Sequence, residues 1–156
     1  MSRLVIPVTD VKLWHTGDVL LRLFVDLDLK NAGGGWKTEE FQVDTASDMT
    51  TFSAYDAKRL GLPMPANAAP GVVHAQTGLE IRSGILRFRI NGMDATEYAV
   101  FCLFLGDPDT PPDPLQKAAL PRKLLQPLQL VDKLKFTEQK DPALGNLYGE
   151  LVIEKV

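Results

Sequence analysis

The sequence predicts a mostly β protein with one or two short helices. Long stretches alternate between apolar and polar residues, which is the period of two that a half-buried strand requires. Turn signals separate these stretches, most clearly at residues 31–35 and 91–92. Helix start and stop signals are few by comparison. The 156 residues fit one domain spanning 1–156, which is long enough to bury its own core.

The composition restricts the partners and the location. A formal net charge of −3 with dispersed lysines and arginines argues against a nucleic-acid surface, which normally carries a basic stripe. No apolar run approaches the ~20 residues that cross a bilayer, so no membrane partner is expected. The apolar stretch within residues 1–7 is too short for a secretory signal, and a cytoplasmic location is the expectation. Cys102, the one cysteine, lies in an apolar run and is expected to be a buried small hydrophobe.

The first part of the chain predicts three strands. Residues 4–8 are rich in β-branched side chains and interrupted by a proline, which suits an edge or terminal strand. Residues 18–29 alternate over their whole length, and after the glycine turn residues 36–43 return as the second strand of a hairpin. This second strand leads directly into Asp44, so the hairpin ends in a carboxylate.

The middle of the chain predicts a short helix and then further strands. The helix covers residues 53–60, with Ser53 as its N-cap and a glycine just after its end. Residues 71–81 are expected to form two extended arms around a polar tip of small residues. The second arm continues through residues 84–90, and residues 95–105 follow as a more apolar and therefore more buried strand.

The last third of the chain is less regular. Residues 106–114 hold four prolines and three aspartates, a composition typical of a mobile loop. Residues 115–134 are predicted to be helical in part, with interruptions at two prolines. Residues 133–137 predict a short alternating strand, and residues 149–156 predict a terminal strand.

Few residues could carry chemistry. The two histidines, His15 and His74, lie far apart in the sequence, and no Cys/His cluster has ligand spacing, so neither a metal nor a cofactor is expected. There is no glycine-rich phosphate loop and no Gly-x-Ser-x-Gly elbow. Asp44 remains as the candidate. Its simplest interpretation is an Asx-turn at the end of a strand, made with Thr45 and Ser47.

The surroundings of Asp44 favour a second interpretation. Residues 41–52 read Phe-Gln-Val-Asp-Thr-Ala-Ser-Asp-Met-Thr-Thr-Phe, and residues 54–63 read Ala-x-x-Ala-Lys-Arg-Leu-Gly-Leu-Pro. This segment resembles the active-site segment of retropepsin-like aspartic peptidases, and is most similar to that of their bacterial single-domain members. In that family, Asp-Thr/Ser-Gly-Ala/Ser after an apolar residue is followed by a β-branched run and often by a small helix that ends in Leu-Gly-Leu.

The resemblance implies a fold and an assembly. The fold is a closed retropepsin-like barrel with one or two short helices, and the assembly is a two-fold homodimer. The strands at residues 4–8 and 151–156 take the place of the interdigitating dimer interface, which would also cover exposed sheet edges.

Two further segments are implied by the same resemblance. Residues 71–81 take the place of the flap, the hairpin that closes over substrate, with Ala75, Gln76, Thr77 and Gly78 at its substrate-binding tip. The Leu-Leu-Gln of residues 124–126 takes the place of two apolar residues and a glycine that precede the family's C-terminal helix.

The implied chemistry is that of an aspartic endopeptidase acting on an extended peptide or protein, bound as an added strand. Two carboxylates share one proton, so that one activates water and the other protonates the substrate carbonyl. Asp48 lies in the same loop as Asp44 and cannot face it across a cleft. The second carboxylate is therefore Asp44 of another copy, placed by a two-fold axis. Thr45 supplies a hydroxyl cross-brace, and Ala46 and Ser47 supply supporting hydrogen bonds.

Two alternatives remain open. The family's motif glycine is replaced by Ala46, and the second element ends in Gln126. A retropepsin-like domain without catalysis, which binds peptides or only dimerises, would fit both changes, because a fold does not guarantee a chemistry. The other alternative is a structural β-barrel in which Asp44 only caps a turn.

Overall fold

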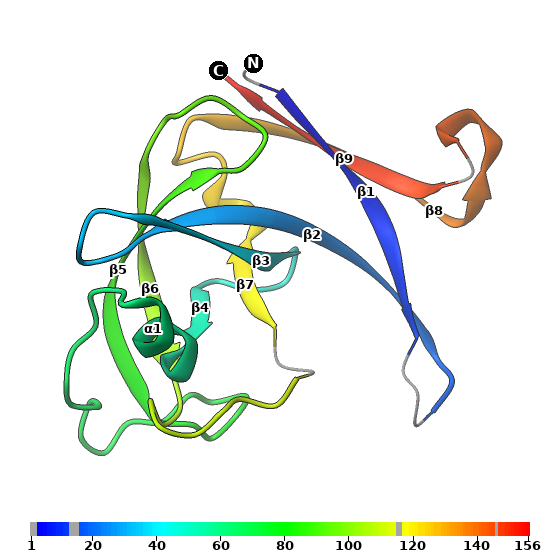
Figure 1. Cartoon of the computed structure of the whole chain (residues 1–156). Coiled ribbons are helices and arrows are strands. Elements are labelled where there is room, and N and C mark those ends of the chain that lie inside the picture. The colour runs from blue at the N-terminus through cyan, green and yellow to red at the C-terminus, as the bar shows by residue number, and fades with distance from the viewer. Residues whose placement is uncertain (1–2, 13–15, 115–116, 146) are drawn as a thin grey trace.

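The computed structural model describes residues 3–12, 16–114, 117–145 and 147–156, and most of them are in strands (Figure 1). The strands are β1 (Arg3–Lys12), β2 (Val19–Lys30), β3 (Trp36–Asp44), β4 (Thr50–Ser53), β5 (Ile81–Ile90), β6 (Tyr98–Leu105), β7 (Ala118–Pro121), β8 (Leu130–Asp141) and β9 (Leu147–Lys155). The helices are α1 (Ala54–Leu60) and the 3-10 turns η1 (Arg122–Leu124) and η2 (Pro142–Leu144).

A closed barrel forms the centre of the molecule. Among the described residues six strands pair in the order β3-β7-β4-β6-β5-β2, and β2 pairs back with β3 to close the ring (Figure 1). The β2–β3 and β5–β6 pairs are antiparallel hairpins, whereas β3–β7 and β4–β6 are parallel. The predicted mostly β barrel with a short helix is confirmed.

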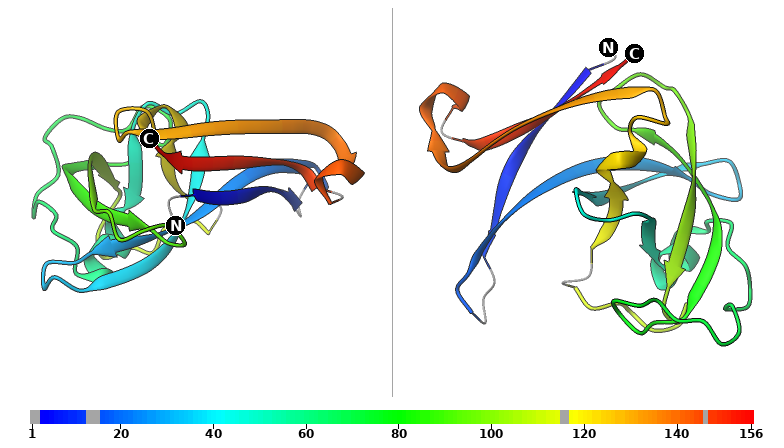
Figure 2. Two further views of the ribbon diagram at one scale, coloured as in Figure 1. Left: turned by 90° about the horizontal axis from the view of Figure 1, so that it is seen from above. Right: turned by 180° about the vertical axis from the view of Figure 1, so that it is seen from behind.

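Three strands extend from this barrel as an arm, made of β1, β9 and β8. Residues 3–7 of β1 pair with β9, and residues 8–12 pair with β2, so β1 changes partner directly after Pro7. A proline lacks the N–H of a ladder bond, so the point where a strand changes partner tolerates it well. Figures 1 and 2 show the β8–β9 hairpin reaching away from the barrel.

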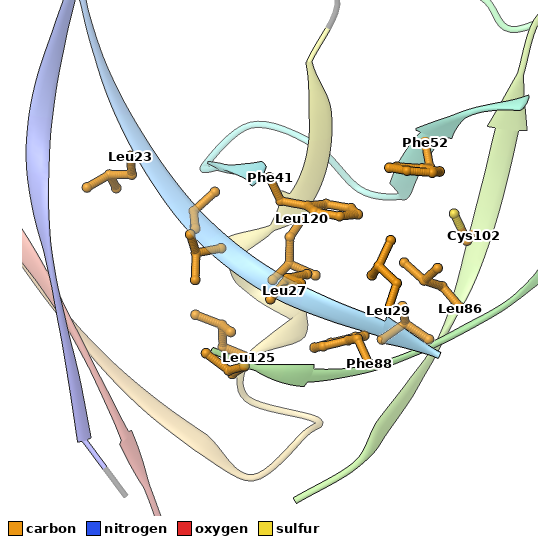
Figure 3. Packing of buried hydrophobic residues seen from close by; sticks show 14 of the residues in the cluster. Leu23, Leu27, Leu29, Phe41, Phe52, Leu86, Phe88, Cys102, Leu120 and Leu125 are labelled. Atoms are coloured by element: carbon orange, nitrogen blue, oxygen red, sulfur yellow. The ribbon is translucent and has the colours of Figure 1, made fainter. Parts of the chain in front are cut away.

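The core lies inside the barrel and is lined by side chains from all six of its described strands (Figure 3). The rings of Phe41 and Phe52 stack with centroids 5.5 Å apart and planes 8° apart, which joins β3 to β4. Cys102 is fully buried, as predicted, and burial raises the pKa of its thiol well above the usual value. A thiol in this state is a packing group rather than a nucleophile.

The short helix forms where the sequence predicts it. The Ser53 hydroxyl accepts the N–H of Asp56 at 3.2 Å, and Gly61 ends the helix in the left-handed region at φ 71°. The residues just before it were not expected to be a strand. They form β4, because the segment pairs with β6 on one side and with β7 on the other.

The helical prediction for residues 115–134 is confirmed only for the 3-10 turn η1, and residues 115–116 lie outside the described part. The other residues of this range form β7, η1, a turn and the start of β8. β7 is a short apolar run between β3 and β4, and its backbone groups pair with these two strands. Pairing within the barrel therefore decides its conformation.

A buried carboxylate ties three barrel strands together. Asp28 of β2 accepts hydrogen bonds from Thr38 (2.6 Å), Arg89 (3.0 Å) and Asn91 (3.2 Å). Burial alone raises the pKa of the Asp28 carboxyl, but these hydrogen bonds and the Arg89 charge outweigh it and hold the pKa below its usual value. The guanidinium of Arg89 also lies 4.4 Å from the ring centre of Trp36.

Asp28→Asn should lower the free energy of unfolding by about 1–3 kcal/mol at neutral pH, the contribution of hydrogen bonds to a charged group. Because the folded pKa lies below the unfolded value, this contribution is present above the unfolded pKa and is lost as pH falls through the folded pKa. Urea unfolding of both proteins between neutral and acidic pH measures the effect. Asp26→Asn, at an exposed position of the same strand, is the control. A difference that stays constant with pH would contradict this origin.

Candidate functional site

Asp44 is the last residue of β3. In the parallel pairing of β3 with β7 it lies opposite Pro121, which is fully buried. The Asp44 side chain is half-buried, and its Oδ1 accepts the N–H of Ala46 at 2.9 Å. This is the Asx-turn that the simplest interpretation predicts. The turn holds the carboxylate at the end of a barrel strand.

The rest of the loop is fixed at two further points. The Ser47 hydroxyl donates to the carbonyl of Met49 at 2.9 Å. The Asp48 carboxylate contacts the ammonium group of Lys123 in η1. The loop is thus joined to the segment that follows β7. Its first residues after Asp44, Thr45 and Ala46, are exposed.

Alanine fits at position 46 without backbone strain. Among the described residues Gln129 is the one non-glycine with a positive φ, so Ala46 adopts an ordinary conformation. The glycine of the family motif is therefore not needed here for its left-handed conformations. What alanine adds is one exposed methyl group on the loop.

In the family, the element whose place residues 124–126 were expected to take precedes a C-terminal helix. The described residues after 126 contain no α-helix. Leu124 ends η1, and Leu125 is buried in the core. The apolar segment that runs beside Asp44 is β7.

Two residues that contact this loop were missed from the sequence: Pro121, opposite Asp44, and Lys123, which contacts Asp48. The signal that could have found Pro121 is the apolar run of residues 118–120 directly before it. No local signal indicates Lys123, since its partner Asp48 is distant in sequence. The pairing of β7 with β3 places Pro121 opposite Asp44, and η1 with Lys123 comes directly after β7.

A small pocket of about 210 Å³ opens beside the loop that follows Asp44. Apart from Asp48 and Thr50 its lining is apolar, and the lining residues are Asp48, Met49, Thr50, Ala99, Val100, Phe101, Leu124, Pro127 and Leu128. A larger hollow of about 550 Å³ lies around residues 62–65 and β5, and none of its lining residues belongs to the loop at 44–47. The smaller pocket is the one that adjoins the candidate site.

Residues 71–81, called the 71–81 hairpin below, form a short and tightly closed hairpin. One bridge pairs Val73 with Glu80, and the N–H of His74 donates to the carbonyl of Leu79 at 2.8 Å. At the tip, Gly78 has φ 69° and donates its N–H to His74 at 2.7 Å. The four predicted tip residues are exposed: Ala75, Gln76, Thr77 and Gly78.

The barrel sets the spacing between this hairpin and the loop of Asp44. The hairpin leads into β5 at Ile81, which pairs with Leu105, and Leu105 pairs with Ser53 at the end of β4. β4 begins at Thr50, just after the loop. At the usual rise of a strand, the nearest ends of the two segments, at Ile81 and Thr50, are roughly 10 Å apart along the strands, and the hairpin extends from Ile81 away from the loop. A few extended peptide residues span this distance.

Neither a metal site nor a membrane-spanning helix is found among the described residues. No group of three His, Cys, Asp or Glu side chains among them could hold a metal ion. None of their helices is long and apolar enough to cross a membrane.

Comparison with known proteins places the fold. No family model and no curated protein matches the sequence. Among solved structures, the chain is similar to the crystal structure of a retropepsin-like aspartic protease from Rickettsia conorii, with a TM-score of 0.55 and 13% identity. The similarity covers 98% of this chain and 90% of that chain. The fold is retropepsin-like. At 13% identity the likeness shows the fold alone and does not establish a catalytic activity.

Proposed function

We propose that the protein is an aspartic endopeptidase that hydrolyses peptide bonds with one Asp44 from each subunit of a homodimer. The observation that supports this proposal is the half-buried carboxylate of Asp44 at the end of a barrel strand, in a loop held by Ala46, Ser47 and Asp48. A rigid loop of this kind keeps a catalytic group in one orientation.

The proposed mechanism needs two carboxylates that share one proton. One Asp44 acts as a base on a water molecule, and the Asp44 of the partner subunit protonates the carbonyl oxygen of the scissile bond. The Ala46 N–H holds the first carboxylate at 2.9 Å, and Thr45 is exposed where it can brace the partner's loop. No step of this mechanism requires a metal or a cofactor.

The dimer interface that we propose differs from the one that the resemblance implies. Residues 4–7 and 150–153 pair with one another inside one chain, so their shared edge is already occupied. Among the described strands β8 ends the order of the sheet and has β9 as its one neighbour. Exposed strand edges invite pairing with a second chain. We therefore place the partner subunit along β8, where Val131 and Phe136 are 44% and 51% exposed.

The first residues of an interface along β8 would lie close to the loop of Asp44. Asp132 of β8 contacts Arg122, the residue after Pro121, and Pro121 is the residue opposite Asp44. The extended peptide would lie between this loop and the 71–81 hairpin, with Ala75, Gln76, Thr77 and Gly78 above it as the flap tip. Main-chain hydrogen bonds would bind the peptide, and side-chain pockets would select it.

The proposal is tested by incubating the purified protein with a peptide library from about pH 4 to pH 7, with and without pepstatin, together with sedimentation analysis. We expect cleavage that pepstatin blocks and that requires the dimer. A dimer that cuts no peptide under any of these conditions would remove the enzymatic function.

A retropepsin-like domain that binds peptides without cutting them is the second candidate. It is favoured by the exposed Ala46 methyl group, which stands where the family motif has no side chain and where the partner's loop would approach. In the same experiment this candidate predicts a dimer that binds peptides but leaves them intact. A monomer that does neither would favour a structural barrel.

A further inference from the structure

One arginine lies buried beneath the stem of the 71–81 hairpin. Arg82, the second residue of β5, is 8% exposed. Its Nη1 donates to Oε1 of Glu80 at 2.9 Å and to the carbonyl of Gly106 at 3.1 Å. Burying a guanidinium group is costly unless charged and polar partners compensate it. Nη1 of this arginine has two polar partners, whereas its buried Nε has no hydrogen-bond partner among the described residues.

The same two segments are also joined through the backbone. The N–H of Gly106 donates to the carbonyl of Glu80 at 2.9 Å, directly beyond the last β5–β6 pair of Ile81 with Leu105. Gly106 has φ 86°, a conformation that favours glycine. The end of the hairpin and the start of the 106–114 loop are thus held by one main-chain hydrogen bond and by Arg82.

The 106–114 loop has an ordered turn at its start. The carboxylate of Asp107 accepts hydrogen bonds from the N–H of Asp109 (2.9 Å) and from the hydroxyl of Thr110 (3.1 Å). Asp109 in turn pairs with Lys58 of α1 at 2.5 Å. The loop is therefore linked to α1 on one side and to the hairpin stem on the other.

We propose that Arg82 is a positioning residue that fixes the 71–81 hairpin to the 106–114 loop, so that the two segments form one wall above the bound peptide. This inference rests on the proposed peptidase function for its substrate, and on the contacts of Arg82 for its geometry. A hairpin that is ordered before binding loses less conformational entropy when the peptide arrives. Arg82 should therefore affect the binding of substrate more than the chemical step.

The expected result for Arg82→Met is a rise in KM of about tenfold with little change in kcat, because one or two hydrogen bonds to a charged group are lost. Arg82→Lys should recover part of the loss, since it keeps the charge but reaches fewer partners. Arg87→Met is the matched control, because Arg87 is an exposed arginine on the same strand. The Arg87→Met substitution should leave KM unchanged.

Hydrogen exchange gives a readout that does not depend on activity. In Arg82→Met, amide exchange should accelerate in residues 73–80 and 106–110 together, and the barrel strands β2 and β3 should keep their protection. Glu80→Gln keeps the buried arginine and should show the same exchange pattern more weakly. This variant tests the inference if Arg82→Met does not fold. Unchanged exchange in both segments, or faster exchange in the hairpin alone, would overturn the inference. If the wild-type protein cuts no peptide, the exchange data still decide the role of Arg82, and only the peptidase proposal fails.

Discussion

The Asp44→Asn variant should lose peptide cleavage by on the order of a thousandfold, the contribution of a general acid and base. Between about pH 4 and pH 7 the asparagine amide cannot act as a base on water, and it cannot donate a carboxylic proton. The variant therefore lacks both catalytic roles of Asp44. The variant should keep the barrel, because asparagine can still accept the N–H of Ala46 in the turn. Cleavage is measured with a fluorogenic peptide, and the dimer by sedimentation.

The control is Asp26→Asn, because Asp26 is an exposed aspartate of β2 outside the loop of Asp44. Its replacement should leave most of the activity. Mixed dimers of wild-type and Asp44→Asn subunits sharpen the test, since both subunits must supply a carboxylate. Mixed dimers with half the wild-type activity would show that each subunit works alone, and the shared-proton mechanism would then be wrong.

Replacing Gly149 in the arm should destabilise the protein strongly. A Cβ at this position would lie 2.0 Å from the carbonyl oxygen of Lys135 and 2.9 Å from Cα of Phe136, and both are backbone atoms of the neighbouring strand. The backbone at Gly149 also has φ 155°. We expect Gly149→Ala to cost roughly 3 kcal/mol or more, from overpacking and strain together. Urea unfolding measures the cost.

Gly145→Ala provides the control within the same hairpin. Gly145 has φ 69°, but no heavy atom lies within 4 Å of its added Cβ. Its replacement should therefore cost only the strain of a left-handed alanine, about 1–2 kcal/mol. Equal losses for both glycines would show that the contact with β8 is unimportant. If β8 forms the dimer interface, Gly149→Ala should also weaken the dimer.

Much of the barrel could be predicted because its signals are local. Alternating residues predict β2, a glycine turn predicts the β2–β3 hairpin, and Ser53 with Gly61 predicts the limits of α1. The loop at Asp44 was identified for the same reason, since the residues of its motif are consecutive. Where neighbours in sequence decide the conformation, one sequence is enough.

The errors fall where distant segments decide the conformation. Residues 118–121 are too few to carry a clear period, and they become a strand only because β3 and β4 lie on either side. Arg82 resembles the other arginines of its alternating strand in sequence, although its surroundings differ. Its partner Gly106 is 24 residues away, a separation that no local pattern covers.

The long strand β2 belongs to two parts of the molecule at once. Its residues 19–23 pair with β1 in the arm, and its residues 24–30 pair with β3, whose last residue is Asp44. Melting of the arm would leave residues 19–23 of β2 without their pairing to β1. If the proposed homodimer forms through the arm, subunit separation and heat denaturation should be a single cooperative event, with a midpoint that rises as the protein is concentrated.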